Sequence, residues 1–470
     1  MSQSVHTYGE IFTTPYEFEN IIDLKITREI NEHSKLYITG IIPEEKIDEY
    51  IENNNKNQGV SIFIKEEDDT KLLFQGIITN MTVNASMNVR SITIEALSAS
   101  FLMDIKKINR SFQNKSMSYN KIFKKITAEY ENSDTIDFVS NNKETGGLLL
   151  QYKETDWEFI KRLASHFYAP IIPAPTVTGL KYYIGMPNSE KAYVLKKESY
   201  SIKKDLKDYQ LKSQNNIEGI EEQNLISYEI TSSKILDLGA AVSLKDKTLY
   251  IYKIVRQIEN GILVNKYSLR DKKGFKCPKL YNHALIGVSI FGKVLDVSKD
   301  VIKIHLEIDS KQSAGEAMWF PYSTVYSSSD GSGWYCMPEI GDKIRLYLPD
   351  ENEKNAFTAS SVNLNSSDPQ KRSDPSVKSI STKYGKQVIF KKGAIDIIGG
   401  GQLLMRLTDD GGIEISSHKK ISISAMEDIE INGGSKITIQ GDEGIQLKQA
   451  SANLDIADSV VIGGAKVNIE

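Results

Sequence analysis

Two acidic side chains, Glu154 and Asp156, are the strongest candidates for chemistry in the sequence. Paired carboxylates are the working groups of glycoside hydrolases, where one acts as an acid and the other as a base or nucleophile. These two carboxylates, however, stand at the start of a predicted helix, in which Thr155-Asp-Trp-Glu158 has the pattern of a capping box. Acidic residues also stabilise the positive end of a helix dipole. We therefore predict structural roles for both and no catalytic residue in the chain.

Other signals of catalysis or of metal binding are weak. The six histidines are scattered without the spacing of a metalloprotease motif, and Cys277 and Cys336 have neither metal-site nor disulfide-framework spacing. Gly399-Gly-Gly401 is not a nucleotide-binding loop and is expected to form a turn. We therefore expect neither a cofactor nor a metal ion, and the protein is predicted not to be an enzyme.

An aromatic cluster between residues 319 and 335 allows two interpretations. Its members are Trp319, Phe320, Tyr322, Tyr326, Trp334 and Tyr335. Exposed aromatic rings in a small barrel can stack on bases or sugars. Such sites usually carry a basic surround, which this segment lacks. Packing in a barrel core and between subunits is therefore favoured.

The elements that hold these residues are helices and many short strands. A short helix is predicted from Pro43, with apolar residues at Ile47, Tyr50 and Ile51. One helix is predicted from Thr155, and its apolar positions share one face: Trp157, Ile160, Leu163, Ala164 and Phe167. Another is predicted after Ser118, which is a favourable N-cap residue. Most of the remaining patterned segments alternate apolar and polar residues, as half-buried strands do.

These patterns predict a mainly β, multidomain chain. Residues 1–280 are expected to form an α+β half of β-barrel type, with two β-rich subdomains and helices. Residues 283–362 contain about five short strands, one of them at 334–337, which suits an OB-fold barrel. A polar linker with two Asp-Pro pairs is predicted at 363–380, followed by a repetitive domain at 381–470.

The repetitive domain has apolar-polar-apolar triplets at a step of eight residues. The apolar members are Met405, Leu407, Ile413, Ile415, Ile421, Ile423, Ile429, Ile431, Ile437, Ile439, Ile445 and Leu447. Each triplet is typical of a short strand with one buried face, and turn formers separate the triplets. Six consecutive triplets in phase argue against chance strands in an ordinary sheet.

The eight-residue step predicts the oligomeric state. One coil of a repeat protein uses at least about 20 residues, so a strand and a turn of eight residues cannot enclose a hydrophobic interior alone. Three chains wound about a shared axis would supply one full turn. We therefore predict an intertwined triple-stranded β-helix, a needle, whose core is formed by the apolar triplets of a homotrimer.

Charge and hydropathy exclude several classes of partner and location. The formal net charge is −4, and basic and acidic residues are spread along the chain, so no nucleic-acid partner is expected. No run of about 18 apolar residues is present. The N-terminal MSQSVHTYGE lacks the apolar core of a signal peptide, so assembly in the cytoplasm is expected.

Two sequence segments resemble a known family. Gln151–Ala164 is similar to a conserved segment of the valine-glycine repeat (VgrG) and phage tail hub proteins, and Met337–Ile344 is similar to their OB-domain signature. The matching positions are Glu154, Asp156, Trp157, Arg162, Pro338, Gly341 and Asp342. The order of hub-like half, barrel, linker and repeat also matches. In this chain isoleucine replaces the family's valine-glycine pattern.

This resemblance implies a homotrimeric spike at the tip of a contractile injection system, such as type VI secretion, a contractile phage tail, an R-type bacteriocin or an extracellular particle. It implies that the N-terminal half binds inner-tube and baseplate proteins. The C-terminal end, with Val467 and Ile469, would bind a PAAR-like tip protein or an effector. The target membrane would be pierced mechanically, by a particle delivered or released outside the cell.

Two other functions are compatible with the same patterns. A trimeric β-helical polysaccharide depolymerase would need paired carboxylates in a groove, whereas the needle's Glu414, Asp428 and Glu430 stand on the polar side of their triplets or between them. A glycan- or nucleic-acid-binding module would use the barrel alone, residues 283–362, and would bind ligand without the needle.

Overall fold

The structure is a computed structural model with two compact units, Met1–Leu364 and Asn365–Glu470, which are described separately. The residues it describes are 6–46, 49–50, 58–66, 69–86, 89–187, 192–194, 199–215, 217–363, 368–401 and 403–456.

The first unit contains one 12-stranded sheet built from two groups of strands. The first group comprises β1 (Ile11–Thr14), β2 (Asn20–Glu29), β3 (Lys35–Ile41), β4 (Gly59–Glu66), β5 (Asp69–Ser86) and β6 (Val89–Ser98). The second comprises β12 (Tyr193–Val194), β13 (Tyr200–Lys204), β14 (Ile226–Ser232), β15 (Ala241–Leu244), β16 (Lys247–Glu259) and β17 (Ile262–Arg270). Each group has its own apolar core because alternate side chains along the strands are buried.

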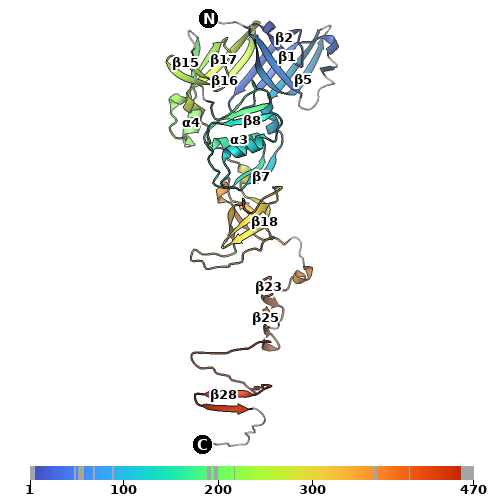
Figure 1. The fold of residues 1–470 in the computed structure, drawn as a ribbon, viewed down its shortest axis with the longest axis vertical. Coiled ribbons are helices and arrows are strands. Elements are labelled where there is room, and N and C mark those ends of the chain that lie inside the picture. The colour runs from blue at the N-terminus through green and yellow to red at the C-terminus, as the bar shows by residue number, and fades with distance from the viewer. Residues whose placement is uncertain are drawn as a thin grey trace. The chain divides into compact units, whose positions relative to one another are not determined.

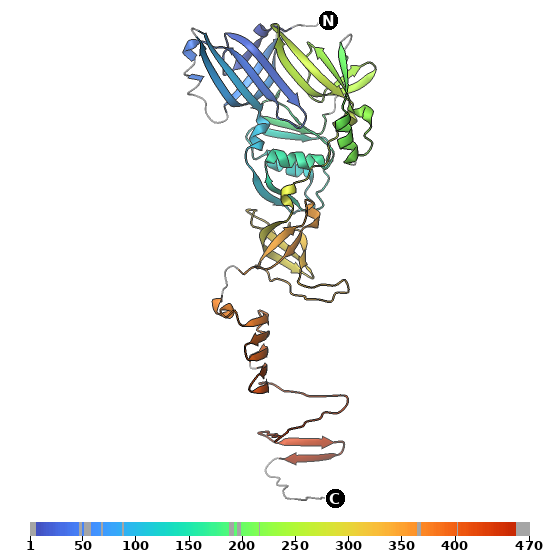
Figure 2. The ribbon, with the colours of Figure 1, turned by 180° about the vertical axis from the view of Figure 1, so that it is seen from behind.

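The two groups are joined edge to edge by strands β2 and β16. These strands pair antiparallel from Lys25 opposite Gln257 to Glu29 opposite Lys253, and Figure 2 shows the two groups side by side. The β-barrel type expected for residues 1–280 is therefore wrong in this respect. The β2–β16 pairing uses an edge of each group, so the sheet continues from β1 to β13.

An α+β module follows the first strand group (Figure 1). Its elements are η3 (Ala99–Asp104), β7 (Ile108–Phe112), α2 (Tyr119–Thr127), β8 (Ser133–Asp137), β9 (Leu149–Glu154), α3 (Asp156–Ser165), β10 (Ile171–Pro173) and β11 (Leu180–Ile184). The helices predicted after Ser118 and from Thr155 are present, and the Ser118 side chain accepts a hydrogen bond from the Lys121 amide, as an N-cap does. The helix expected from Pro43 lies partly outside the described residues. A further helix, α4 (Leu206–Gln214), precedes β14.

A small closed barrel ends the first unit. Its strands are β18 (Val288–Ser298), β19 (Val301–Leu306), β20 (Trp319–Ser323), β21 (Lys343–Leu348) and β22 (Phe357–Ala359). The strand expected at 334–337 is wrong, because this stretch lies in a long loop between β20 and β21. The mainly β, multidomain class is confirmed, and the OB assignment of the barrel stays a prediction.

The second unit begins with an antiparallel meander of five strands. They are β23 (Lys378–Ser381), β24 (Gln387–Lys391), β25 (Ala394–Gly400), β26 (Leu403–Thr408) and β27 (Gly412–Ser416). A hairpin of β28 (Ile445–Gln449) and β29 (Ala452–Ile456) follows later. Residues 417–444, all of which are described, contain no strand paired within the chain.

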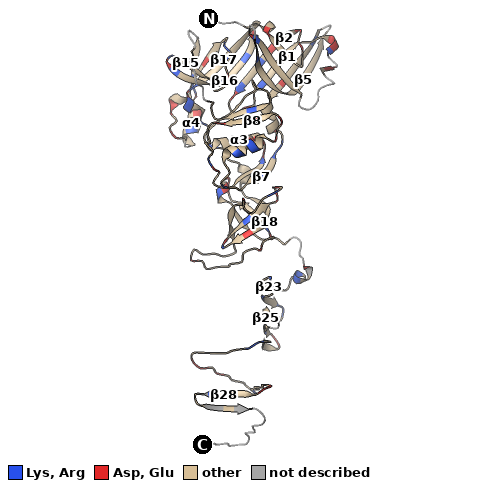
Figure 3. Ribbon diagram, viewed as in Figure 1, with Lys and Arg blue, Asp and Glu red and all other residues tan. Residues whose placement is uncertain are grey.

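Charged side chains are mixed in sign over the described part of the first unit, where Figure 3 shows basic and acidic residues interspersed. Among the described residues, no helix is long and apolar enough to cross a membrane.

Candidate functional site

Helix α3 positions the residues singled out in the first sequence segment. Its N-terminus is the predicted capping box, in which the Thr155 hydroxyl accepts from the Glu158 amide (3.1 Å) and the Glu158 carboxylate accepts from the Thr155 amide (2.9 Å). Two backbone donors at the helix start are thereby satisfied. Helix α3 is therefore fixed at its first turn, and its next residues point into the protein.

Asp156 is fully buried and accepts hydrogen bonds from three side chains. Its carboxylate accepts from the Tyr130 hydroxyl (2.7 Å), the Gln151 amide (2.9 Å) and the Arg110 guanidinium. Burial, together with the hydrogen bond to Asp156, raises the pKa of Tyr130. A carboxylate with all these partners is structural, as predicted from its place at a helix start.

Trp157 anchors the same helix turn against the first strand group. Its ring lies 4.6 Å from the His33 ring and 6.1 Å from the Tyr182 ring, centroid to centroid. Burial lowers the pKa of His33, although its hydrogen bond to Asp104 acts in the opposite direction. A lowered pKa favours the neutral imidazole of His33, which packs against the Trp157 ring as an uncharged group.

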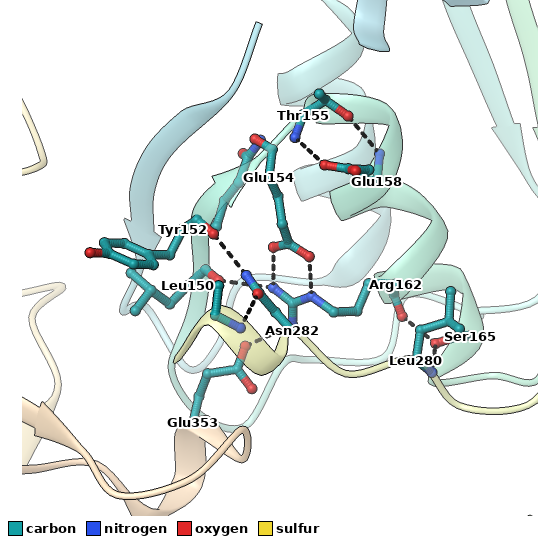
Figure 4. A network of polar contacts seen from close by, with 12 residues as sticks. Leu150, Tyr152, Glu154, Thr155, Glu158, Arg162, Ser165, Leu280, Asn282 and Glu353 are labelled. Carbon is teal, nitrogen blue, oxygen red and sulfur yellow. Dashed lines mark hydrogen bonds and ion pairs between the residues drawn. The ribbon is translucent and has the colours of Figure 1, made fainter. Parts of the chain in front are cut away.

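Arg162 is the centre of a buried charge network that joins the α+β module to the barrel (Figure 4). Its guanidinium donates to both carboxylate oxygens of Glu154 (2.8 Å each), to Glu353 of the barrel (2.8 Å) and to the Leu150 carbonyl (2.9 Å). Arg162 is only 3 % exposed. We call Arg162, Glu154 and Glu353 the joint.

The electrostatics of the joint keep its arginine charged. Burial by itself lowers the pKa of Arg162, but the carboxylates of Glu154 and Glu353 outweigh burial and raise that pKa. Nearby His166 behaves oppositely, because burial, followed by the field of Arg162, lowers its pKa to about 3. The joint is thus a fixed ion triad with a neutral histidine beside it.

Further contacts strengthen the same interface. Asp309 of the barrel accepts from the Ser111 amide (2.7 Å) and hydroxyl (2.6 Å). Gln113 donates to the Ile304 carbonyl (3.2 Å). Burial raises the pKa of Asp309, and its hydrogen bonds to Ser111 oppose that rise. Ser111 of β7 and Gln113 just after it are therefore both hydrogen-bonded to the barrel.

Strand β9 also links two hydrophobic cores. Leu149 packs in the core of the α+β module, whereas Leu148 and Leu150 pack in the core of the barrel. Successive side chains of a strand point to opposite faces, so one short strand serves both cores. The α+β module and the barrel are consequently joined by shared packing as well as by charge.

The remaining family positions lie elsewhere in the barrel. Pro338 is buried, Gly341 has a φ of +97°, and the Asp342 carboxylate accepts from the Glu339 amide (2.9 Å). They shape the turn that enters β21 and do not contribute to the joint. Gly341 suits this turn because a side chain would be strained at that φ.

The predicted needle residues are largely exposed in the single chain. Ile413 is 69 % exposed and Ile423 is 75 % exposed. Exposure of more than a third is shared by Met405, Ile413, Ile415, Ile421, Ile423, Ile429, Ile431, Ile437, Ile439 and Leu447. Leu407 and Ile445 are partly buried. The predicted tip residues Val467 and Ile469 lie outside the described residues.

The apolar face of the needle starts earlier than the sequence analysis placed it. Register pairs put Val388 opposite Ile397 and Phe390 opposite Ile395, and these continue into Met405 opposite Ile397. The same face of the meander therefore carries apolar triplets at 388–390 and 395–397. Both segments carry apolar residues two positions apart, as the later triplets do, but the middle residue of the first is Ile389 and their spacing is not eight.

A charge ladder occupies the other face of the meander. Asp396 is buried and accepts from Lys391 (2.6 Å) and Arg406 (2.8 Å). Hydrogen bonds from Arg406, and then from Lys391, lower the pKa of Asp396 to about 2. Glu414 stands opposite Arg406 in the next strand. The meander therefore has one charged, internally paired face and one apolar, uncovered face.

The aromatic cluster is divided by the structure. Phe320 is buried in the barrel core, and Trp319 and Tyr322 are partly buried. Tyr326, Trp334 and Tyr335 are exposed on the loop between β20 and β21. Core packing is therefore confirmed for Phe320 only.

The candidate site offers no evident chemistry. Glu154 and Asp156 are both committed to buried hydrogen-bonded partners. Among the described residues, no group of three or more His, Cys, Asp or Glu side chains is arranged to hold a metal ion. The joint is a buried structural contact, and neither Glu353 nor the separate interface residue Asp309 has a local sequence signal.

Comparisons with known proteins agree with this architecture. Residues 52–166 match the phage tail baseplate hub (GPD) family. No curated protein matches the sequence.

Three solved structures share the fold at low sequence identity. One is the E. coli c3393 protein, a component of the type VI secretion system described as similar to the T4 bacteriophage tail proteins gp27 and gp5. It has a TM-score of 0.53 and 12% identity, over 75% of this chain and 99% of that chain. The others are a Francisella PdpA-VgrG complex in a half-lidded form and a PdpA-VgrG complex in a lidless form. The half-lidded form has a TM-score of 0.54 and 10% identity over 88% of each chain. The lidless form has a TM-score of 0.52 and 11% identity, over 84% of this chain and 93% of that chain.

These findings support the predicted resemblance: residues 52–166 match the phage tail baseplate hub family, and the chain shares its fold with solved VgrG and type VI secretion structures.

Proposed function

We propose that this protein is a homotrimeric spike that caps the inner tube of a contractile injection system and pierces the target envelope. The observation that carries the proposal is the uncovered apolar face of the needle, in a chain whose first unit has the tail hub fold. An isolated soluble chain rarely exposes so long an apolar face.

Three copies would cover that face. Burying one isoleucine or leucine side chain contributes about 1.5–3 kcal/mol, and the exposed triplets recur from 405 to 447. Residues 417–444 have no strand partner within the chain, so their backbone groups are free to pair with other chains. A prism of interchain strands closed on itself also leaves few edges to fray.

The two strand groups of the first unit support a role at the end of a tube. Each chain carries two groups joined by β2 and β16, so a trimer would present six groups in a ring. Such a ring would match a six-fold inner tube to a three-fold needle. Inner-tube and baseplate proteins are accordingly proposed to bind this sheet.

The joint supports a mechanical role. A spike transmits thrust from the tube to the needle, and the load passes from the hub into the barrel. Arg162, Glu154 and Glu353, with the leucines of β9, make that connection from buried and fully bonded groups. We therefore assign the joint to load transfer, with no catalytic function.

The tip is proposed to carry a PAAR-like protein or an effector through the last residues, including Val467 and Ile469. Assembly in the cytoplasm and delivery outside the cell as part of a particle complete the proposal. The membrane would be pierced by force and would need no binding site.

Electron microscopy of the purified full chain tests this function. Class averages are expected to show a three-fold particle with six strand groups in a ring at one end and a thin shaft. Two-fold or asymmetric particles in every class would overturn the spike assignment.

A further inference from the structure

The loop between β20 and β21 is an ordered projection of the barrel. We call residues 324–337 the arm. The Trp334 amide donates to the Tyr326 carbonyl (2.8 Å), the Ser328 amide donates to the Ser332 carbonyl (2.9 Å), and the Thr324 hydroxyl donates to the Trp334 carbonyl (2.6 Å). The arm is therefore a two-sided ribbon, which projects from the barrel near β18 in Figure 1.

The base and the bend of the arm are fixed as well. The Tyr335 hydroxyl donates to the Lys299 carbonyl (2.8 Å), which ties the arm to the turn after β18. Gly333 has a φ of +138°, and a Cβ at this position would lie 2.3 Å from the Tyr326 carbonyl oxygen. Only glycine fits there, so the sequence itself is suited to the ribbon.

Several large apolar side chains of the arm are exposed to solvent in the single chain. Trp334 is 54 % exposed, Tyr335 is 73 % exposed, and Val325 and Tyr326 are also exposed. Rigid, exposed aromatic residues are typical of the buried centre of protein–protein interfaces. The arm contains one acidic residue, Asp330, and no basic residue.

A complementary surface lies on the outside of the same barrel. Register pairs place Phe291 opposite Arg345, Tyr347 opposite Phe357, and Lys293 opposite Lys343 on one outward face. We call this set the outer face; its members are Phe291, Lys293, Lys343, Arg345, Tyr347 and Phe357. It combines three aromatic rings with three cations, of which Lys343 is ion-paired with Glu307 and Arg345 is exposed.

Two of the three cations of the outer face lie over the Phe291 ring. The Lys343 ammonium lies 4.6 Å, and the Arg345 guanidinium 5.4 Å, from the Phe291 ring centroid. Arg345 is exposed. Its guanidinium can therefore stack on a second ring, and tryptophan is the best such partner. Asp330 would add an opposite charge.

We propose that the arm of one chain docks on the outer face of the neighbouring chain's barrel. This inference rests on the proposed trimer. In a cyclic trimer every interface is heterologous, so each chain must present two different, complementary surfaces. The arm and the outer face are such a pair, and three identical contacts close the ring. The needle holds the three barrels at high effective concentration, which lets a modest contact form.

A thiol cross-link tests the contact in the full chain. Cys336 is an exposed thiol in the arm, and Ser289 is an exposed residue of β18 opposite Tyr347. In Ser289→Cys, a short bis-maleimide reagent is expected to join Cys336 of one chain to position 289 of the next. A denaturing gel should then show bands of two and three chains.

Two matched variants control the experiment. Ser289→Cys with Cys336→Ser should give no ladder. Ser310→Cys, an exposed serine in the loop between β19 and β20, should also give none. Cys336 of the native protein should in addition react more slowly with a maleimide when the protein is assembled than after dissociation.

The outcomes separate this inference from the proposed function. A ladder in Ser289→Cys alone supports docking. An intact trimer without a ladder, or with Cys336 fully reactive, overturns docking and leaves the spike intact. Arms bound to a glycan or a membrane would give that same result. A protein that is monomeric before cross-linking overturns the spike itself.

Discussion

The two units of this chain distribute their side chains in opposite ways. In residues 1–364 apolar residues fill four cores, and even charged groups such as Arg162 are buried with partners. Among the described residues of 365–470 most of the regular apolar residues are exposed, whereas the polar Asp396 is buried. This contrast is what the proposed trimer requires, with a first unit that has its own cores and a second unit whose apolar face other copies would cover.

The largest effect is expected from placing charged side chains on the uncovered apolar face of the second unit. Ile429→Lys with Ile437→Lys would place ammonium groups in the proposed three-chain core, where an unpaired charge costs several kcal/mol. We expect loss of the trimer, measured by light scattering, while the first unit keeps its circular dichroism.

The matched control for that change is Glu430→Lys, which alters the polar residue between Ile429 and Ile431. It should keep the trimer. If the double lysine variant assembled as well as Glu430→Lys, Ile429 and Ile437 would not lie in the core between the chains.

Within the first unit, the largest loss of stability is expected when the ion triad of the joint is disrupted. Glu353→Gln removes one carboxylate from the buried guanidinium of Arg162, and breaking such a pair costs about 3–5 kcal/mol. We expect earlier denaturant unfolding of the barrel and faster proteolysis near it. Trimer assembly through the needle should persist.

Glu351→Gln serves as the control for the joint, because Glu351 is close in sequence and only partly buried. Its unfolding midpoint should match the native protein. Equal unfolding midpoints for Glu351→Gln and Glu353→Gln would show that the joint does not stabilise the first unit.

A smaller loss of stability is expected when the pH is lowered, because acid protonates Asp396 on the charged face of the meander. The pKa of Asp396 is lowered to about 2, so its folded form favours the charged state. Stability from Asp396 is therefore present above its ordinary pKa near 4 and is lost as the pH falls from about 4 to about 2. Thermal unfolding of the native needle should be acid-sensitive in this window, and Asp396→Asn should remove that dependence. A pH response unchanged by Asp396→Asn would contradict the assignment.

The smallest effect is expected at the cap of α3. Thr155→Ala removes a hydroxyl that accepts from the Glu158 amide, and loss of such a cap costs about 1 kcal/mol. The unfolding midpoint should fall slightly, whereas Thr155→Ser should restore it. A fall as large as that of Glu353→Gln would mean that Thr155 has a role beyond capping.

Local signals in the sequence predicted local structure well. The Ser118 cap and the Thr155 capping box placed both helices, because each depends on residues within one turn. Alternation predicted most barrel strands. The octad predicted an apolar face, and its residues are the ones that the single chain leaves uncovered.

Contacts between distant residues could not be predicted in this way. Pairing of β2 with β16 and the bond from Arg162 to Glu353 join residues about 200 positions apart. No pattern within either segment encodes its partner. The sequence predicts a strand at 334–337 because Trp334 and Tyr335 have strand propensity, whereas glycines and backbone hydrogen bonds make the arm a projecting ribbon.

The central claim is that the exposed apolar face of the second unit is covered by two further copies. The most direct test is the mass of the full chain in dilute solution, by light scattering. The account predicts three times 52.8 kDa, about 158 kDa, persisting on dilution. A stable mass of 52.8 kDa, with the face still exposed, would contradict it.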